Sequence, residues 1–228
     1  MTSSQNAAST EGSSTWVSAE VPMTYLHRNS GEGKPVLMLF HGYEDTAAGV
    51  LRRSLGDAKS FSDFEIFAPN GLFPVPVRIE GGFKQTFAWY FADYSKQQVL
   101  IPPDVSARAV AELVHKLKLQ DRPKILLGFS QGGFFLPFVL PYLKHVKKLF
   151  GIGAGYRVGD YPQDFSLVVD AFHGKDDEIV PFSRAQASFH ELSRINPHGK
   201  IHSFENLGHT MNDESRSLLK REIERTLK

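Results

Sequence analysis

The sequence predicts an α/β fold with a mostly parallel central sheet and helices on both faces. Short apolar runs alternate along the chain with longer segments whose apolar residues recur at helical spacing, which is the pattern of strand–helix–strand units. The residues able to do chemistry come directly after predicted strands, and ligands of such sheets bind beyond the carboxyl ends of the strands. A chain of 228 residues is also long enough for one such domain with a substantial core.

Apolar runs and helical periodicity locate the individual elements. The run VLMLF at 36–40, bounded by Pro35 and Gly42, predicts a buried parallel strand. Apolar residues from Ala109 to Leu117 follow the i, i+3, i+4 spacing of a buried helix face, and Asp104 can cap the start of that helix. The predicted strands are 16–21, 23–27, 36–40, 64–68, 124–128, 147–153, 166–172 and 200–205. The predicted helices are 47–60, 104–119, one that begins at 131, 182–195 and 212–227.

Two segments fall outside this alternation. Residues 1–15 are rich in Ser, Thr, Ala and Gly and bury too little to offset the entropy of ordering, so we expect a disordered tail followed by one domain over 16–228. Residues 71–103 are interrupted by prolines and glycines and are predicted to be irregular, with room for a small flap over a site. The helix that begins at 131 contains Pro137 and Pro141, which predict an interruption there.

Composition excludes several classes of function. The net charge of +1 gives no electrostatic indication of nucleic-acid binding. The sequence contains no apolar run of about 18 residues, so no membrane-spanning helix is expected. The chain has no cysteine, so disulfides, thiolate zinc sites and a cysteine nucleophile are excluded. The start lacks the pattern of a secretory signal, and we expect a cytoplasmic protein. No paired histidine spacing for a metal and no phosphate-binding loop is found, so neither a metal nor a cofactor is expected.

The stretch GFSQGG at 128–133 lies between an apolar strand-like run and an apolar helix-like run. Glycines permit the sharp turn that lifts Ser130 out of the backbone, and Gly128-Phe129-Ser130-Gln131-Gly132 fits the G-x-S-x-G pattern of a nucleophilic serine. The pattern alone is weak, because serine and glycine are common in this chain. A base, an acid and an oxyanion site must therefore follow in the right context.

A serine hydroxyl needs a neutral imidazole to take its proton, and the imidazole needs a carboxylate to fix its tautomer. Of the nine histidines, His209 follows the last predicted strand and precedes the last helix, which is the place expected from the chain order Ser, Asp, His. Two aspartates, Asp176 and Asp177, follow the strand 166–172, and periodicity cannot separate them.

The tetrahedral intermediate of acyl transfer needs backbone N–H donors at its oxyanion. Gln131 follows the serine at the start of a helix, and Tyr43 lies in the loop after the strand 36–40, so their N–H groups are the two candidates. Trp89, Phe134 and Phe73 are the aromatic candidates for the lining of an apolar substrate pocket, although core packing is the more common role for such side chains.

The ordered motifs resemble the carboxylesterase/phospholipase family of α/β-hydrolases, which includes acyl-protein thioesterases and small bacterial esterases. The motifs that carry the resemblance are LFHGYEDT at 39–46, FAPNG at 67–71, AWYFADY at 88–94, GFSQGG at 128–133, HGKDDEIVP at 173–181 and LGH at 207–209. The resemblance implies an α/β-hydrolase fold and selects Asp177 as the acid, with Ser130 and His209 as its partners. Glu44 departs from the family, which commonly has a glycine there.

The sequence thus predicts a serine hydrolase of carboxylic esters or thioesters with small to medium apolar acyl groups, acting through an acyl-enzyme. Its partner would be a small-molecule substrate, and the oligomeric state is left open. A non-catalytic binding protein on the same fold is the first alternative, because fold alone does not establish activity. A hydrolase of lactones or peptides is the second.

Overall fold

The computed structural model describes residues 20–31, 33–93, 96, 98–162, 166–195 and 197–227. The predicted tail at 1–15 therefore lies outside the described residues. The central sheet has seven strands in the order β1-β3-β2-β8-β9-β10-β11. β1 runs antiparallel to β3, and all other pairs are parallel, as predicted. The strands of this sheet are β1 (Tyr25–Arg28), β2 (Val36–Phe40), β3 (Glu65–Pro69), β8 (Lys124–Phe129), β9 (Val146–Ile152), β10 (Val168–Gly174) and β11 (Ile201–Phe204).

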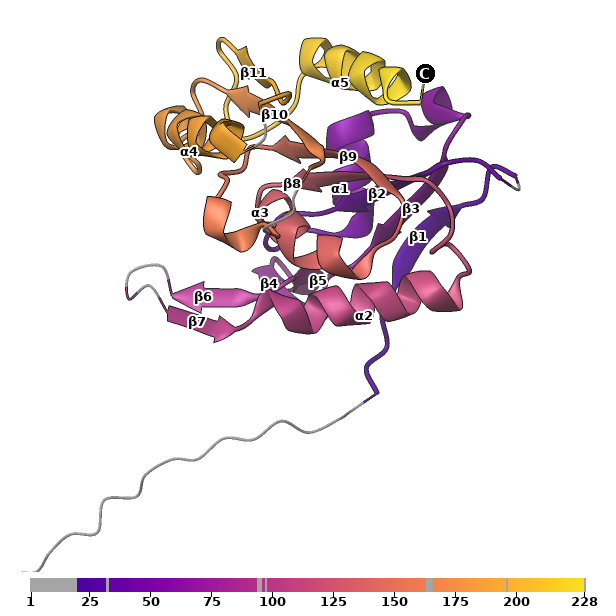
Figure 1. The fold of residues 1–228 in the computed structure, drawn as a ribbon. Coiled ribbons are helices and arrows are strands. Elements are labelled where there is room, and N and C mark those ends of the chain that lie inside the picture. The colour runs from indigo at the N-terminus through magenta and orange to yellow at the C-terminus, as the bar shows by residue number, and fades with distance from the viewer. Residues whose placement is uncertain are drawn as a thin grey trace, which may run out of the picture.

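Helices cover both faces of the sheet (Figure 1). They are α1 (Ala47–Leu55), α2 (Pro103–Lys116), α3 (Gln131–Val139), α4 (Phe182–Ile195) and α5 (Asp213–Arg225), with 3₁₀ turns at Ala58–Phe61, Leu140–Tyr142 and Val158–Asp160. Side chains of β2 alternate between the two faces, as the strand period requires. Val36, Met38 and Phe40 pack in the core under α2, α3 and α4, whereas Leu37 and Leu39 pack in the core under α1 and α5.

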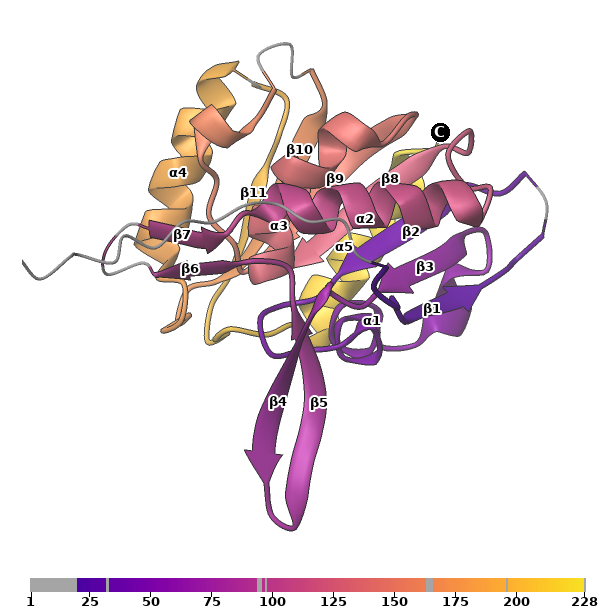
Figure 2. The same ribbon diagram turned by 90° about the horizontal axis from the view of Figure 1, so that it is seen from below.

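The segment predicted to be irregular instead contains two antiparallel strand pairs. β4 (Phe73–Ile79) pairs with β5 (Gly82–Ala88), and β6 (Phe91–Asp93) pairs with β7 (Gln98–Ile101). The first pair projects from the body of the molecule as an arm (Figure 2). Proline is tolerated here because each strand of a two-stranded ribbon has an unpaired outer edge.

Three local predictions need correction or refinement. Of the strands predicted at 16–21 and 23–27, β1 is the one found; residues 20 and 21 are outside any strand, and 16–19 lie outside the described residues. The proposed cap of α2 is wrong, because the helix starts at Pro103, which is favoured at a first helical position, and Asp104 sits in its first turn. The helix after the serine does break near its prolines: α3 contains Pro137 and ends at Val139, where a 3₁₀ turn with Pro141 follows.

None of the helices in the described part of the chain has both the length and the apolar composition needed to cross a bilayer.

Candidate active site

Ser130 occupies a tight turn between β8 and α3. Its backbone has φ 51° and ψ −119°, a conformation that costs a residue with a side chain of order 1–3 kcal/mol. Its N–H donates to the carbonyl of Ile152 at 2.8 Å, and its own carbonyl accepts from Gly133 and Phe134 at 2.8 and 3.1 Å. Neighbouring β9 and the first turn of α3 therefore hold the strained serine in place.

The glycines of the turn are required by close backbone contacts. A Cβ on Gly128 would lie 2.3 Å from the carbonyl oxygen of Gly132, and a Cβ on Gly132 would lie 2.1 Å from that of Phe40. A Cβ on Gly133 would lie 2.5 Å from the Cβ of Ala154. The three glycines of GFSQGG thus let α3 start directly against the ends of β2 and β8.

His209 and Asp177 form a hydrogen-bonded pair on two loops at the carboxyl edge of the sheet. His209 Nδ1 lies 2.7 Å from Asp177 Oδ2. The other carboxylate oxygen, Oδ1, accepts from the N–H groups of Ile179 and Val180 at 3.0 and 2.8 Å. A carboxylate only accepts, so Nδ1 carries a proton and Nε2 of the neutral ring is free to accept one.

A second histidine, His173, supports the acidic loop, and sequence reasoning did not single it out. Its Nε2 donates to the carbonyl of Val180 at 2.7 Å and lies 3.3 Å from Asp177 Oδ2. Burial lowers the pKa of His173, which favours the neutral ring. The sequence signal that could have identified His173 is its position at the end of β10, four residues before Asp177.

Residues next to Ser130 and to its partner on β9 lie beside the imidazole of His209. Ser130 is bonded to Ile152, and the next residue, Gly153, faces the pair: a Cβ there would lie 3.0 Å from His209 Cε1 and 3.6 Å from Asp177 Oδ2. The ring of Phe129 also lies 4.9 Å from that of His209, between centroids. Among the described residues no hydrogen bond joins Ser130 Oγ to the imidazole, and such contacts often tighten only when substrate binds.

The loop after β2 lies against the serine turn. A Cβ on Gly42 would lie 3.3 Å from Ser130 Cβ, so the next residue, Tyr43, is adjacent to the nucleophile. Within the described part of the chain, the backbone N–H groups of Tyr43 and Gln131 donate to no acceptor. Both are thus available to an oxyanion, and that of Gln131 lies at the positive end of α3.

His41 fixes the shape of this loop. Its Nε2 accepts from the N–H of Gly71 at 2.8 Å, and its Nδ1 donates to the carbonyl of Gly42 at 2.7 Å. Its own carbonyl accepts from the indole N–H of Trp89 at 2.8 Å. Complete burial lowers the pKa of His41 to about 4, which keeps the ring in the neutral tautomer that these bonds require.

The side chain of Gln131 ties the nucleophile to the segment after β5. Its Oε1 accepts from the N–H of Trp89 at 3.0 Å, and its Nε2 donates to the carbonyl of Tyr90 at 3.0 Å. The amide side chain thereby fixes the path of the chain at 89–90 relative to Ser130.

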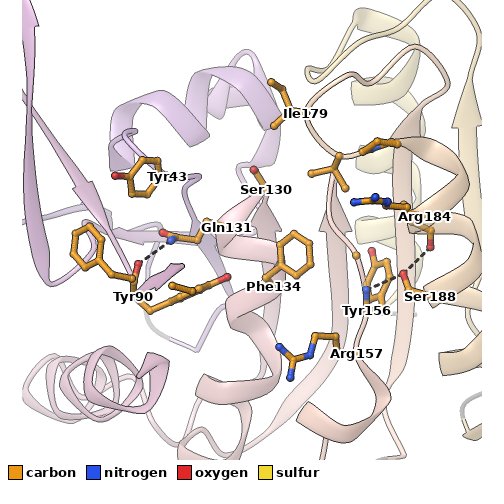
Figure 3. A pocket seen from close by; sticks show the side chains of 16 residues that line it. Tyr43, Tyr90, Ser130, Gln131, Phe134, Tyr156, Arg157, Ile179, Arg184 and Ser188 are labelled. Atoms are coloured by element: carbon orange, nitrogen blue, oxygen red, sulfur yellow. Dashed lines mark hydrogen bonds between the residues drawn. The ribbon is translucent and has the colours of Figure 1, made fainter. Parts of the chain in front are cut away.

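A cavity of about 640 Å³ opens in front of Ser130 (Figure 3). Aromatic and aliphatic side chains form most of its wall. It is lined by Tyr43, Tyr90, Phe91, Ala92, Ser130, Gln131, Phe134, Gly155, Tyr156, Arg157, Ile179, Val180, Pro181, Arg184, Ala185 and Ser188. The cavity includes the serine and both oxyanion candidates, so it is the site where a substrate would bind.

The three aromatic pocket candidates have different positions. Phe134 lines the cavity. Trp89 does not: it is fully buried and stacks on Phe135 with the ring centroids 4.7 Å apart. Phe73 also lies outside the lining and packs edge-on against Phe91 at 5.8 Å. The segment 71–103 nevertheless supplies one wall of the cavity through residues 90–92.

The described residues contain no group of three or more His, Asp or Glu side chains arranged to hold a metal ion.

This fold is that of the α/β-hydrolases, and the candidate serine, histidine and carboxylate lie at the carboxyl edge of its sheet. Residues 24–227 match the model of the phospholipase/carboxylesterase family, and the chain belongs to that family. It is therefore a hydrolase of the esterase type. The comparison with curated proteins found no match.

Similar solved structures include two plant proteins and one further esterase. SOBER1 of Arabidopsis thaliana superposes with a TM-score of 0.64 at 20% identity, over 86% of this chain and 100% of the other. Acyl-protein thioesterase 2 of Zea mays gives 0.62 at 19% identity, over 92% and 100%. Esterase PE8 gives 0.62 at 21% identity, over 90% and 98%.

Proposed function

We propose that the protein is a serine hydrolase that cleaves carboxylic esters or thioesters of small molecules through an acyl-enzyme intermediate. The observation that carries the proposal is the pairing of His209 with Asp177 beside a strained, cavity-facing Ser130. Membership of the phospholipase/carboxylesterase family supports the reaction class.

Acylation begins when Ser130 Oγ attacks the carbonyl carbon of the substrate. As the C–O bond forms, the hydroxyl proton passes to Nε2 of His209, because Nδ1 already carries a proton bound to Asp177. Asp177 stabilises the resulting imidazolium and keeps its orientation.

The negative charge of the tetrahedral intermediate falls on the former carbonyl oxygen. The N–H groups of Tyr43 and Gln131 are the donors for this oxyanion, and one such donor is typically worth about 10²–10³ in turnover. The intermediate collapses when the bond to the leaving alkoxide or thiolate breaks, and His209 returns its proton to that group. Water then repeats the sequence on the acyl-enzyme and releases the acid.

The size of the cavity favours small to medium acyl groups. A volume of about 640 Å³ lies in the middle of the range for small-molecule sites. Phe134, Ala185 and Val180 offer an apolar wall near the serine. Similarity to acyl-protein thioesterase 2 of Zea mays supports thioesters, as well as oxygen esters, as candidate substrates.

The decisive experiment compares the parent protein with Ser130→Ala on 4-nitrophenyl esters from acetate to palmitate, with a thioester alongside. Loss of the nucleophile should lower kcat by at least about 10³-fold. Ser217→Ala is the matched control, because Ser217 is exposed on α5 and should leave the rate unchanged. Equal ester turnover by the parent and Ser130→Ala would contradict the proposal.

An organophosphonate probe separates the alternatives. A folded parent protein that the probe fails to label would favour a non-catalytic binding protein. A labelled protein that turns over lactones or peptides faster than simple esters would favour the other hydrolase classes.

A further inference from the structure

The wall of the cavity carries two cations and no anion. Of the residues that line it, Arg157 and Arg184 are the charged ones, and no Asp or Glu in the described part of the chain lines it. The sequence predicted an apolar pocket, and neither arginine was identified as a residue that lines it. Figure 3 places them on the side of the cavity formed by α4 and the loop after β9.

The two arginines differ in how their charge is balanced. Arg157 Nε lies 3.1 Å from Asp160 Oδ2, so its charge is offset within the protein. The side chain of Arg184 makes no ion pair and no hydrogen bond with any residue that the structure describes. The cavity therefore has about one uncompensated positive charge, at Arg184.

The backbone of Arg184 is held in place relative to Asp177, and its exposed side chain extends from this anchored start of α4. It lies in the first turn of α4, directly after the loop whose N–H groups at 179 and 180 bind Asp177. One turn further along α4, Ser188 accepts from the N–H of Tyr156 at 3.0 Å and donates to the carbonyl of Ala185 at 2.9 Å. These bonds join α4 to the loop after β9 on the same side of the cavity, and they join the loop before α4 to Asp177.

We propose that the preferred substrate is an ester that carries a carboxylate at the end of a short apolar stem, and that Arg184 binds this carboxylate. The planar guanidinium matches a carboxylate in shape, and a single uncompensated charge matches a monoanion. The apolar side chains of Phe134, Val180 and Ala185 line the space in which the stem would lie. The proposal rests on the proposed function, because it assigns the substrate class of the same site.

The kinetic test compares isosteric anionic and neutral esters. In the first arm the carboxylate is on the acyl part, as in monoethyl glutarate against ethyl glutaramate. In the second arm it is on the alcohol part, as in 4-acetoxybutyrate against 4-acetoxybutanamide. The parent enzyme should favour the anion by about three- to tenfold in kcat/KM in one arm, and added salt should reduce the preference, because Arg184 is exposed.

Two substitutions test whether Arg184 causes the preference for the anionic ester. Arg184→Gln should bring the anion-to-amide ratio close to one while turnover of the neutral amide persists. Arg194→Gln, a matched exchange at an exposed position near the other end of α4, should keep the parent ratio. A ratio of one or less in both arms for the parent, or an unchanged ratio in Arg184→Gln, would overturn the proposal.

A binding measurement keeps this test independent of activity. Monoethyl glutarate and 4-acetoxybutyrate are titrated into Ser130→Ala by calorimetry, each beside its amide, and the series is repeated with Arg184→Gln added. Tighter binding of an anion than of its amide, lost on the second substitution, supports the carboxylate site even if no ester is hydrolysed. Equal binding of both anions and their amides contradicts the site, whereas absent turnover alone contradicts only the proposed function.

Discussion

Asp177 uses its two carboxylate oxygens for different purposes. Oδ1 accepts from two backbone N–H groups of its own loop, at 179 and 180, and Oδ2 faces Nδ1 of His209. The first set of bonds fixes the carboxylate, and the second fixes the tautomer of the ring. The two backbone bonds to Oδ1 therefore prevent rotation of the carboxylate, while Oδ2 remains bound to the ring of His209.

This arrangement predicts the effect of Asp177→Asn. The amide oxygen of Asn should keep the two backbone bonds, which turns its NH₂ toward His209 Nδ1. The ring must then carry its proton on Nε2 and cannot accept one from Ser130. We expect kcat on an ester to fall by about 10²–10⁴-fold with little loss of stability, measured by steady-state kinetics and chemical unfolding.

Asp176→Asn is the control for that substitution. Asp176 is exposed, and its N–H donates to the carbonyl of Leu207, so its side chain can change without effect on the ring. An equal loss of activity in both variants would remove the distinction between the two aspartates.

At this scale the structure places the side chains selected for the triad at one edge of the sheet, whereas only one of the three aromatic candidates lines the cavity. Motif order located Ser130 and His209, but adjacent residues such as Trp89 and Tyr90 differ only in the direction of the side chain. The structure buries Trp89 and turns Tyr90 to the cavity. The chain bends here, so no helical or strand periodicity of side chains could predict the two directions. Arg184 was hidden because a cation in the first turn of a helix is usually a solvated surface residue.

At the scale of elements, the turn between β8 and α3 depends on the absence of side chains. Its glycines allow the helix to begin against backbone atoms of β2 and β8. The strain at Ser130 persists because bonds to Ile152, Gly133 and Phe134 over-determine its conformation.

Gly132→Ala should test this dependence. The new Cβ would lie 2.1 Å from the carbonyl oxygen of Phe40 and 2.7 Å from that of His41, and neither backbone group can move without the sheet or the loop. We expect the free energy of unfolding to fall by at least about 2 kcal/mol. Gly159→Ala, where nothing lies within 4 Å of the new Cβ, should change it by less than about 0.5 kcal/mol. Equal chemical unfolding curves for the two variants would contradict the account.

Elements with strong periodicity were predicted well, and those built from turns and short ribbons were not. The prediction of a helix at 182–195 is confirmed by α4, and the main parallel strands agree within about two residues. The arm of β4 and β5 was missed because it contains prolines at 74 and 76. Proline argues against a central strand, and the sequence does not show that each strand of the arm pairs on one side only. Gly81, which lies in the turn at its tip, and Gly82, which begins β5, were the signal that could have located the turn.

At the scale of the whole molecule, stability depends on histidines that stay neutral. Burial lowers the pKa of His41 to about 4 and also lowers the pKa values of His173 and His202. The unfolded chain takes up protons on these rings near pH 6.5, whereas the folded protein takes them up only at lower pH. Stability is therefore fully present above that pH and is lost as the pH falls toward 4.

We expect His41 alone to lower the free energy of unfolding by about 2–3 kcal/mol between pH 7.5 and 4.5. Urea unfolding across this range measures the loss. His41→Gln should flatten the pH dependence, and His190→Gln, at an exposed position on α4, should leave it unchanged. A parent protein whose stability is level or rises on acidification would show that these rings are not held neutral.

Between β3 and α2 the chain is bonded to the serine turn and to the loop after β2 at several places, which include the bonds of Gly71 to His41 and of Phe87 to Asp45. Gln131 clamps residues 89 and 90, and the indole of Trp89 is bound to the loop beside the serine. The tip of the β4–β5 arm lies beyond these bonds, and no described residue of β4 or β5 lines the cavity. We therefore expect the arm to tolerate a change in length that leaves the position of Ser130 unaltered.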